Sequence, residues 1–598
     1  MENKAEKKIS RPGVYTGYSP VLYSGWKLFS QYITVRDGTK LAADIYRPML
    51  EGKVVDKPHP VIWVHTPYNR KSSRPKGTPS APYAGSPVID RELGTIERIG
   101  TDLIKFGYVA AVVDFRGVKA SYGVNRAFNR GEWSGSAFWD SYDITEWLAA
   151  QSWCDGNVGM WGCSGTGGSQ TQVAATMAPH LKAIMPMCCE FDAYAQWCRG
   201  GVVGGKPESP PSLPKPIDPD DLSEAVPVDA DTDGTMLKEA LEQHKYNVGT
   251  RGVHPDDNAG YTPCRDSMSP WLGEKWWIVS SPYTHIERIK RSGTAIYSCS
   301  ALKDIDRQGL FMGFVNYTNP RKILFAPGPH CQFPEFDVIA EELRWYDYWL
   351  KGIDNGIMDE PPIYYYTGGA PEGKEWRSAW CWPLPNEKRV DYYLGPGTSG
   401  CKNAGINDGT LSTTSPTLAG EKDIYTVDYD VNAQNQSSKS LTYTTAPLTS
   451  DVEVTGHPVI HLWISSSTTD ADFLAYLEDV DEDGISSVVT DGKLRASHRV
   501  LHTPPYDNLG LPWHGSYEND LIPLIPDEPT ELVFDLLVTS QIFKAGHRIR
   551  LTVTCADPPT LDRPESKALK FSPPPTITVY RNPVKISYIT LPIIAQWP

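Results

Sequence analysis

A run of small residues around one serine constrains this chain more than any other feature. The segment Gly162-Cys-Ser-Gly-Thr-Gly-Gly-Ser-Gln170 follows a glycine-bounded apolar run that predicts a strand, and residues 171–178 after it predict a helix. Glycine at 162 and 167 would let strand and helix approach closely around a strained turn. Backbone N–H groups at the start of the helix would then point at the hydroxyl of Ser164. The pattern predicts a nucleophile elbow, although glycine-rich turns also carry serines without a role.

Length, charge and cysteine usage narrow the class of protein. With 598 residues the chain is too long for a single core, and three or four domains are expected. The net charge of −15 argues against a nucleic-acid partner. We expect neither a signal peptide nor a membrane span, because the N-terminus lacks an apolar segment and no run reaches 18 apolar residues. Eleven scattered cysteines without a C-x-x-C pair predict free thiols in a reducing cytoplasm, rather than disulfides or a zinc site.

The first part of the chain alternates between strand and helix patterns. Val61–His65 and Val109–Asp114 are continuous apolar runs, typical of strands that are covered on both faces. Helical patterns occupy residues 94–106 and 139–150, and residues 32–48 alternate around an Asp-Gly turn as a hairpin does. This order predicts the α/β fold class with a mostly parallel sheet.

The pattern changes twice further along the chain. A Pro- and Asp-rich stretch followed by tryptophan-rich segments predicts an inserted helical cap, after which strands at 294–299 and 322–326 and a helix at 340–350 complete the sheet. From about residue 361, short β-rich runs without helices predict a β-sandwich of the jelly-roll type. The predicted domains are an α/β-hydrolase core (1–189 and 291–360), a helical cap (190–290) and a C-terminal jelly roll (361–598).

A nucleophilic serine needs an imidazole to take its proton and a carboxylate to orient that imidazole. In α/β-hydrolases these partners follow the serine in the order acid, base, each at the end of a later strand. The two resumed strands run into Asp304 and His330, which are therefore the expected acid and base. Asp306 competes for the acid role, and His285 and His254 in the predicted cap compete for the base. The alternative is that all of these are ordinary polar loop residues.

Further motifs occur in order along nearly the whole chain: Asp37–Pro48, Thr66–Asn69, Asp114–Gly117, Trp147–Trp153, Asn157–Ser164, Pro447–Gly456 and Phe543–Leu551. With them the sequence resembles the cocaine esterase/X-prolyl dipeptidyl-peptidase (CocE/NonD) family of hydrolases. The resemblance implies Ser164 as nucleophile, Asp304 as acid and His330 as base. It also implies an oxyanion hole formed by the Tyr68 hydroxyl and the Gly165 backbone N–H, under a helical cap and beside a jelly roll.

The sequence departs from the family pattern at two places. Gly165 stands where the family usually has tyrosine, and residues 301–304 read Ala-Leu-Lys-Asp where the family often has Gly-Trp-Tyr-Asp. The group donated at position 165 is a backbone N–H, so the predicted oxyanion hole survives while the pocket wall changes. The substrate preference of any one family member therefore does not carry over.

Together these features predict a cytoplasmic serine hydrolase without metal or cofactor that cleaves a small-molecule ester or amide through an acyl-enzyme. No nucleic-acid or membrane partner is expected, and the resemblance allows a homodimer. One alternative is an X-prolyl dipeptidyl peptidase or an α-amino-acid ester hydrolase, in which Glu190 and Asp192 would bind the substrate ammonium group. Another is a non-catalytic binding protein that works through its C-terminal domain on a hydrolase scaffold.

Two other charged motifs have structural interpretations. Arg116 is expected to tie a strand-end loop to nearby carbonyl groups rather than to bind an anionic substrate. Residues 479–484 (Asp-Val-Asp-Glu-Asp-Gly) resemble the start of a calcium loop, but Thr490 occupies the position of its essential glutamate and excludes an EF-hand. A turn between two strands is expected there instead.

Overall fold

A computed structural model describes residues 10–15, 19–70, 103–126, 131–203, 213–248, 262–270, 272–432, 435–557 and 568–595. The chain forms two compact units. The first comprises Met1–Ala193, Glu208–Asn258 and Met268–Tyr364, and the second Tyr194–Pro207, Ala259–Ser267 and Tyr365–Pro598. Two short pieces of the predicted cap thus group with the C-terminal unit, and the predicted domain boundaries stay predictions.

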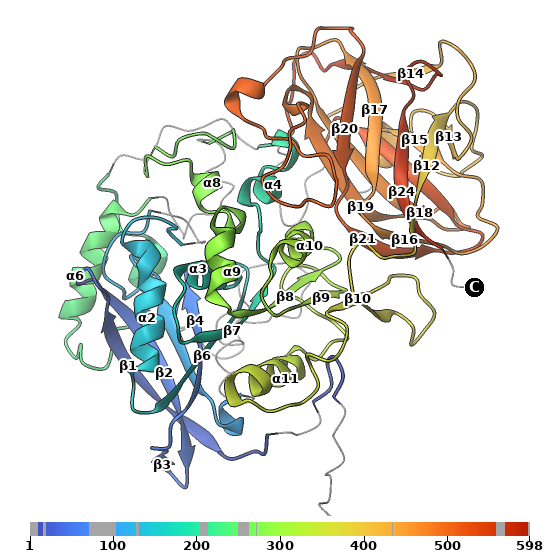
Figure 1. The fold of residues 1–598 in the computed structure, drawn as a ribbon. Helices are drawn as coiled ribbons and strands as arrows, with labels where there is room; N and C mark the ends of the chain where they lie inside the picture. The colour runs from blue at the N-terminus through green and yellow to red at the C-terminus, as the bar shows by residue number, and fades with distance from the viewer. Residues whose placement is uncertain are drawn as a thin grey trace, which may run out of the picture. The chain divides into compact units, whose positions relative to one another are not determined.

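A mixed sheet runs through the first unit (Figure 1). Its strands follow the spatial order β1 (Gly25–Thr34), β2 (Lys40–Leu50), β5 (Val109–Asp114), β4 (His59–Thr66), β6 (Cys154–Cys163), β7 (Leu181–Met187), β8 (Ala295–Ala301) and β9 (Arg321–Ala326). A two-residue strand, β3 (Lys53–Val54), pairs with the end of β2. The strands from β5 to β9 run parallel, whereas β1 and β2 form an antiparallel hairpin. The α/β class, the mostly parallel sheet and the hairpin are confirmed.

Helices pack on both faces of the sheet around strand β6. The helix α3 (Gly165–Thr176) lies against β6 and β7, and α11 (Val338–Lys351) packs on the same two strands. A Cβ added at Gly159 would point at Leu350 and Tyr346 of α11, whereas one at Gly162 would point at the start of α3. Side chains alternate along a strand, so these two helices cover opposite faces.

The helices predicted at 139–150 and 340–350 are confirmed as α2 (Asp140–Ala149) and α11. The helix predicted at 94–106 lies mostly outside the described residues, and its last part is a short 3₁₀ turn, Ile104–Phe106. Another helix of the first unit, α10 (Arg307–Asn316), packs on β8 and β9 near the site described below.

The insertion between β7 and β8 contains short helices: α4 (Ala193–Trp197), α5 (Pro219–Glu224), α6 (Thr235–Gln243), α8 (Trp276–Val279) and α9 (Ile286–Ser292). Helices this short are not stable alone, so contacts with the core must hold them. The Lys119 ammonium donates to Glu224 at 3.1 Å, and the buried Arg70 donates to the Val226 carbonyl at 2.7 Å. Helix α9 packs directly on α3.

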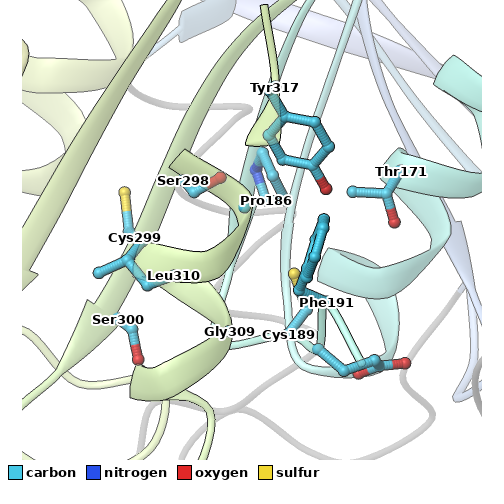
Figure 2. Close-up of a pocket in the computed structure, with 12 residues that line it drawn as sticks. Thr171, Pro186, Cys189, Phe191, Ser298, Cys299, Ser300, Gly309, Leu310 and Tyr317 are labelled. Carbon is cyan, nitrogen blue, oxygen red and sulfur yellow. The ribbon is translucent and has the colours of Figure 1, made fainter. Parts of the chain in front are cut away.

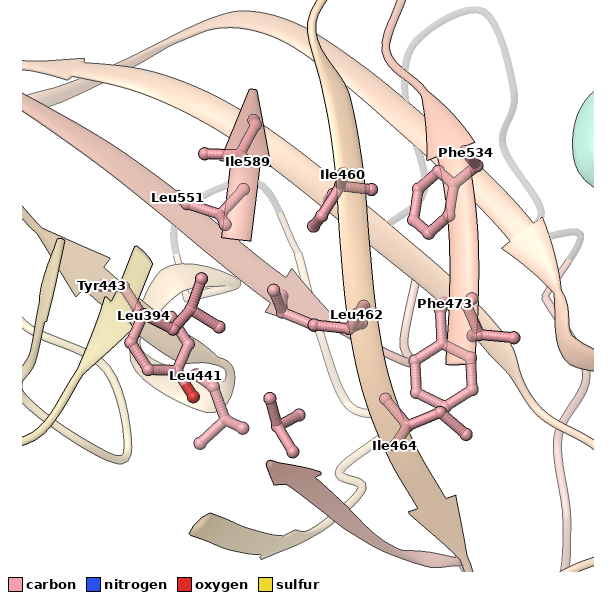
Figure 3. Packing of buried hydrophobic residues seen from close by; sticks show 14 of the residues in the cluster. Leu394, Leu441, Tyr443, Ile460, Leu462, Ile464, Phe473, Phe534, Leu551 and Ile589 are labelled. Atoms are coloured by element: carbon pink, nitrogen blue, oxygen red, sulfur yellow. The ribbon is translucent and has the colours of Figure 1, made fainter. Parts of the chain in front are cut away.

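The second unit is rich in β-structure. The last strands of the first sheet are β10 (Ile363–Tyr366) and β11 (Trp376–Ala379), which follow β9 in its order, and a separate 13-stranded sheet comes after them in the sequence. Its core contains Leu394, Ile460, Phe473 and Phe534 (Figure 3). The C-terminal β-domain is therefore confirmed. Its strands are β12 (Glu387–Gly395), β13 (Gly409–Ser412), β14 (Lys422–Thr426), β15 (Leu441–Thr444), β16 (Val452–Gly456), β17 (Val459–Ser466), β18 (Asp472–Val480), β19 (Ser486–Arg495), β20 (Thr530–Asp535), β21 (Thr539–Phe543), β22 (Arg548–Thr554), β23 (Thr576–Tyr580) and β24 (Tyr588–Ile594).

The calcium-like motif forms the turn between β18 and β19, as predicted. The Asp479 carboxylate lies 2.9 Å from Nδ1 of His547, so one of the acidic groups has a protein partner. Among the described residues, no helix is both long enough and apolar enough to cross a membrane.

A buried histidine of β4 should make the stability of the protein depend on pH. Burial lowers the pKa of His65 to about 3, and neither ring nitrogen has a hydrogen-bond partner in the described part of the chain. In the unfolded chain the pKa of histidine is about 6.5, so acid protonates the unfolded state first. Between pH 6.5 and pH 3 the free energy of unfolding should therefore fall by about 1.4 kcal/mol per pH unit. Replacing His65→Leu should flatten the dependence of the unfolding free energy on pH from 6.5 downwards. Parallel curves for both proteins in denaturant titrations would contradict this.

Candidate active site

Ser164 occupies the turn between β6 and α3 in a strained backbone conformation, with φ +62° and ψ −123°. Its N–H donates to the Met187 carbonyl at the end of β7 at 2.9 Å, and its carbonyl accepts from the N–H groups of Gly167 and Gly168, also at 2.9 Å. The helix begins at Gly165, directly after the serine, and not at 171 as predicted. The reason is that these hydrogen bonds let the small residues themselves form the first turn.

Both glycines that the elbow was predicted to need are required by the geometry. A Cβ at Gly162 would lie 2.4 Å from Oγ1 of Thr166, and its φ of +149° disfavours any side chain. A Cβ at Gly167 would lie 2.3 Å from the Met187 carbonyl oxygen, a backbone atom of the neighbouring strand. The prediction that small residues at these two positions allow strand and helix to approach closely is confirmed.

Two hydrogen-bonding groups lie beside the serine hydroxyl. The Tyr68 hydroxyl, which follows β4, donates to Oγ of Ser164 at 3.4 Å. The Gly165 N–H donates to the same tyrosine oxygen at 3.2 Å. The two groups predicted for the oxyanion hole therefore lie together beside the Ser164 hydroxyl.

Asp304 and His330 meet at the ends of β8 and β9. Nδ1 of His330 lies 2.9 Å from Oδ2 and 3.1 Å from Oδ1 of Asp304, whereas the carboxylate of Asp306 lies at 3.4 Å. The geometry favours Asp304 over its competitor. Burial by itself would raise the pKa of Asp304, but the charge and hydrogen bond of His330, a hydrogen bond with Cys188 and the Asp306 N–H together hold it below its ordinary value. The buried Asp304 carboxylate is therefore the nearer acidic partner of the His330 imidazole.

The serine and the imidazole are linked indirectly. No hydrogen bond joins Ser164 to His330, two residues that the structure describes. Their neighbours Cys163 and Cys331 form a disulfide across 168 positions of sequence, with Cα atoms 5.9 Å apart. The prediction that the cysteines are free thiols is wrong for this pair. It failed because β6 and β9 end at the same edge of the sheet, which the spacing of the cysteines does not reveal.

A third cysteine, which the sequence did not point to, lies at the same place. Cys188 follows β7 and is fully buried; its sulfur accepts from the Cys331 N–H at 3.3 Å. Burial, and then the nearby Asp304 carboxylate, raise the pKa of the Cys188 thiol well above its ordinary value. The sulfurs of Cys163, Cys188 and Cys331 are close enough together to bind a metal ion, but the disulfide removes two of the three thiolates that a soft metal would need.

The other candidates lie elsewhere. Nε2 of His285 lies 2.8 Å from the Val279 carbonyl and its ring stacks on Phe138, which gives it a packing role, and His254 is outside the described residues. Arg116 holds the carboxylates of Asp140 and Asp37 and not backbone carbonyls as predicted, although its role is structural as expected.

A small pocket is lined by residues of α3 and α10, among them Thr171 and Leu310 (Figure 2). Glu190 lines it together with Phe191 and Tyr317, between α3 and α10. Both Glu190 and Asp192 are buried, with 4% and 5% of their surfaces exposed. That either carboxylate binds a substrate ammonium group stays a prediction.

A mostly parallel sheet whose central strand ends in a strained serine turn defines the class of α/β-hydrolases. Residues 37–332 match the X-Pro dipeptidyl-peptidase (S15 family) model, and residues 355–589 match the X-Pro dipeptidyl-peptidase C-terminal non-catalytic domain. A relative from Mycobacterium bovis named as a serine esterase is 30% identical over 96% of both chains. The chain belongs to the CocE/NonD hydrolases of the S15 family and is a serine hydrolase of the esterase or X-Pro peptidase type.

Other similar proteins are also named as esterases or related hydrolases. The cocaine esterase of Rhodococcus is 26% identical, over 94% of this chain and 98% of that protein. A CocE/NonD family hydrolase from Staphylococcus aureus has the same fold, with a TM-score of 0.67 at 18% identity over 98% of this chain and 99% of its own. An α-amino acid ester hydrolase matches with a TM-score of 0.65 at 19% identity over 99% and 100%.

The close packing at Gly167 predicts the result of a single added methyl group. Gly167→Ala would drive its Cβ into the Met187 carbonyl, and we expect a loss of more than about 2 kcal/mol of stability together with loss of hydrolase activity. Gly25→Ala is the matched control, because its Cβ would meet nothing within 4 Å. Thermal unfolding measures both variants, and equal melting temperatures would show that the elbow is not closely packed.

Proposed function

We propose that this protein hydrolyses a carboxylic ester through an acyl-enzyme, with Ser164 as nucleophile, His330 as general base and Asp304 as the acid that orients it. The observation that carries the proposal is the buried Asp304–His330 pair at 2.9 Å, at the same sheet edge as the strained serine. With Nδ1 bonded to the carboxylate, the proton of the neutral ring resides on Nδ1 and Nε2 is the base.

The first half-reaction requires a hydrogen bond between Ser164 and His330. Rotation of the serine side chain would bring its hydroxyl from Tyr68 to the imidazole. Nε2 then takes the serine proton as Oγ attacks the substrate carbonyl carbon. The imidazolium that forms is stabilised by the buried Asp304 carboxylate, and it gives its proton to the departing alcohol. In the second half, His330 activates a water in the same way and the acid product leaves.

The oxyanion is held by the Tyr68 hydroxyl and the Gly165 N–H. In the structure these groups bond to each other and to the serine, which shows how close they are. A substrate carbonyl oxygen placed between them would accept both hydrogen bonds. Because α3 starts at Gly165, the partial positive charge at its N-terminus adds to the stabilisation of the negative oxygen.

An X-prolyl dipeptidyl peptidase or α-amino-acid ester hydrolase is the second candidate. The match of residues 37–332 to the X-Pro dipeptidyl-peptidase (S15 family) model supports it, and Glu190 is a carboxylate that such a substrate's free ammonium group would need. Hydrolysis of a nitrophenyl ester and of an Ala-Pro anilide should be compared on one enzyme preparation. Preferred hydrolysis of the anilide, lost in Glu190→Gln, would favour the peptidase over the esterase.

Removing the nucleophile tests the proposed mechanism. Ser164→Ala should lower kcat on a small activated ester by roughly 10⁶-fold, because the hydroxyl and its base act as one unit. A fluorophosphonate probe should label the parent protein at Ser164 and leave the variant unlabelled. Ordinary turnover by the variant would exclude the proposed nucleophile, and folded parent protein that the probe does not label would support a non-catalytic binding protein.

Removing one oxyanion donor tests the role of Tyr68. Tyr68→Phe should reduce kcat by roughly 10²- to 10³-fold with a smaller change in KM, because the hydrogen bond strengthens mainly in the transition state. Tyr246→Phe, at an exposed position, is the matched control and should behave as the parent enzyme does. Equal kcat values for the two variants would remove Tyr68 from the oxyanion hole.

A further inference from the structure

The disulfide joins the two residues that flank the proposed nucleophile and base. Cys163 directly precedes Ser164, and Cys331 directly follows His330. We propose that the Cys163–Cys331 disulfide is a positioning link that holds His330 within reach of Ser164, so that its reduction lowers turnover without unfolding the protein. This proposal rests on the triad proposed above.

The nucleophile end of the link is rigid. Cys163 is the last residue of β6. Its N–H donates to Oγ1 of Thr166, and the same hydroxyl donates to the Cys163 carbonyl, both at 2.8 Å. The Ser164 N–H is fixed to β7 through the Met187 carbonyl. A sulfur attached to this backbone is therefore a fixed point, which can restrain whatever is bonded to it.

The base end of the link lies in a loop. His330 belongs to the connection between β9 and α11, which contains neither helix nor strand from residue 327 to 337. Cys331 itself has a left-handed backbone, with φ +58°. The backbone bonds from the Lys303 N–H to Gly328 and from the Gln332 N–H to Pro329 support this loop, at 3.0 and 3.1 Å. None of these bonds connects the loop to the strand that carries the serine, whereas the disulfide does.

This asymmetry matters because the serine and the imidazole are not hydrogen-bonded before substrate binds. Their separation is then determined by the backbones that carry them, and a misplacement of about 1 Å costs roughly 10²-fold in rate. Asp304 fixes the orientation of the ring through Nδ1, while the link limits how far the whole loop moves from β6. The two restraints act on different degrees of freedom.

Breaking the link requires an external reductant. A dithiol transfers two electrons and two protons to the disulfide, giving the Cys163 and Cys331 thiols and the oxidised cyclic disulfide of the reagent. The Cys188 sulfur lies within 4.8 Å of both linked sulfurs, but its burial keeps it protonated, and a thiol does not attack a disulfide. The neighbouring cysteine therefore does not open the link by exchange.

The test measures kcat and KM on a small activated ester before and after reduction with dithiothreitol, with alkylation and mass spectrometry to report the state of both cysteines. We expect reduction to lower kcat roughly ten- to hundredfold with little change in KM, while circular dichroism stays native and oxidised glutathione restores the rate. Cys163→Ala, Cys331→Ala and the double variant should each match the reduced enzyme and no longer respond to dithiothreitol. Equal losses in single and double variants identify a link that acts as one unit.

Cys381→Ala, at an exposed position in the second unit, is the control and should retain both the parent rate and its response to reductant. Unchanged kcat after complete reduction of the folded parent enzyme would overturn the proposal, as would full activity in protein whose two cysteines are thiols from the start. Neither result affects the proposed triad, which fails only if Ser164→Ala keeps ordinary turnover. Because reduction is applied to folded parent enzyme, the test stands even if a cysteine variant fails to fold.

Discussion

The site depends on the left-handed backbone of Ser164. A non-glycine residue in this conformation costs of order 1–3 kcal/mol, and it persists only where the surroundings leave no alternative. Here the Ser164 N–H is bonded to β7 and its carbonyl to two N–H groups of α3, while the glycines on either side leave no room for relaxation. The strained turn places the Ser164 hydroxyl and the Gly165 N–H beside the same Tyr68 hydroxyl, so in our proposal one local constraint sets both the nucleophile and a donor for the oxyanion.

The proposed acid and the proposed base are held by different means. Asp304 is fully buried at the end of a strand, where an ionised carboxylate would be unfavourable without nearby donors. His330, the Cys188 thiol and the Asp306 N–H supply that compensation, which is why the pKa of Asp304 is lowered despite burial. His330 is partly exposed and carried by a loop, which would let the proposed base meet both substrate and water. Its restraint comes from Asp304 and, in our proposal, from the disulfide.

The fold and most of the candidate site could be predicted because their signals are local or ordered along the chain. Gly162 and Gly167 around a serine reveal the turn, and the order of strands after the insertion places Asp304 and His330 at one sheet edge. The start of α3 was predicted too late, since glycine and serine are poor helix formers by propensity and only the tertiary hydrogen bonds of the turn make them helical. Arg116 was correctly given a structural role, but its carboxylate partners depend on packing between distant segments.

The disulfide and the position of Cys188 could not be predicted either, because both depend on contacts between segments that are distant in the sequence. The residues Cys163 and Cys331 are separated by 168 positions, and their pairing follows from the sheet order and not from any spacing rule. The inference from an odd number of scattered cysteines to free thiols assumed that all eleven share one state. One pair can form a disulfide while the others stay free. A single pair beside the site therefore weakens that argument as support for a reducing compartment.

The departures from the family pattern separate the chemistry from the substrate preference. The group proposed to act at position 165 is a backbone N–H. The loop before Asp304 is held by backbone bonds too, from the Leu302 N–H to the last residue of β9 and from the Lys303 N–H to Gly328 in the loop after it, so side-chain changes there leave Asp304 in place. Gly165 has no side chain where the family usually has tyrosine directly after the serine, and Lys303 is exposed where the family often has tyrosine. Backbone groups thus hold the proposed catalytic geometry, which does not depend on the side chains at these positions. Relatives named as esterases, ester hydrolases and peptidases on one fold fit this division, because a change of substrate requires no change in the atoms that react.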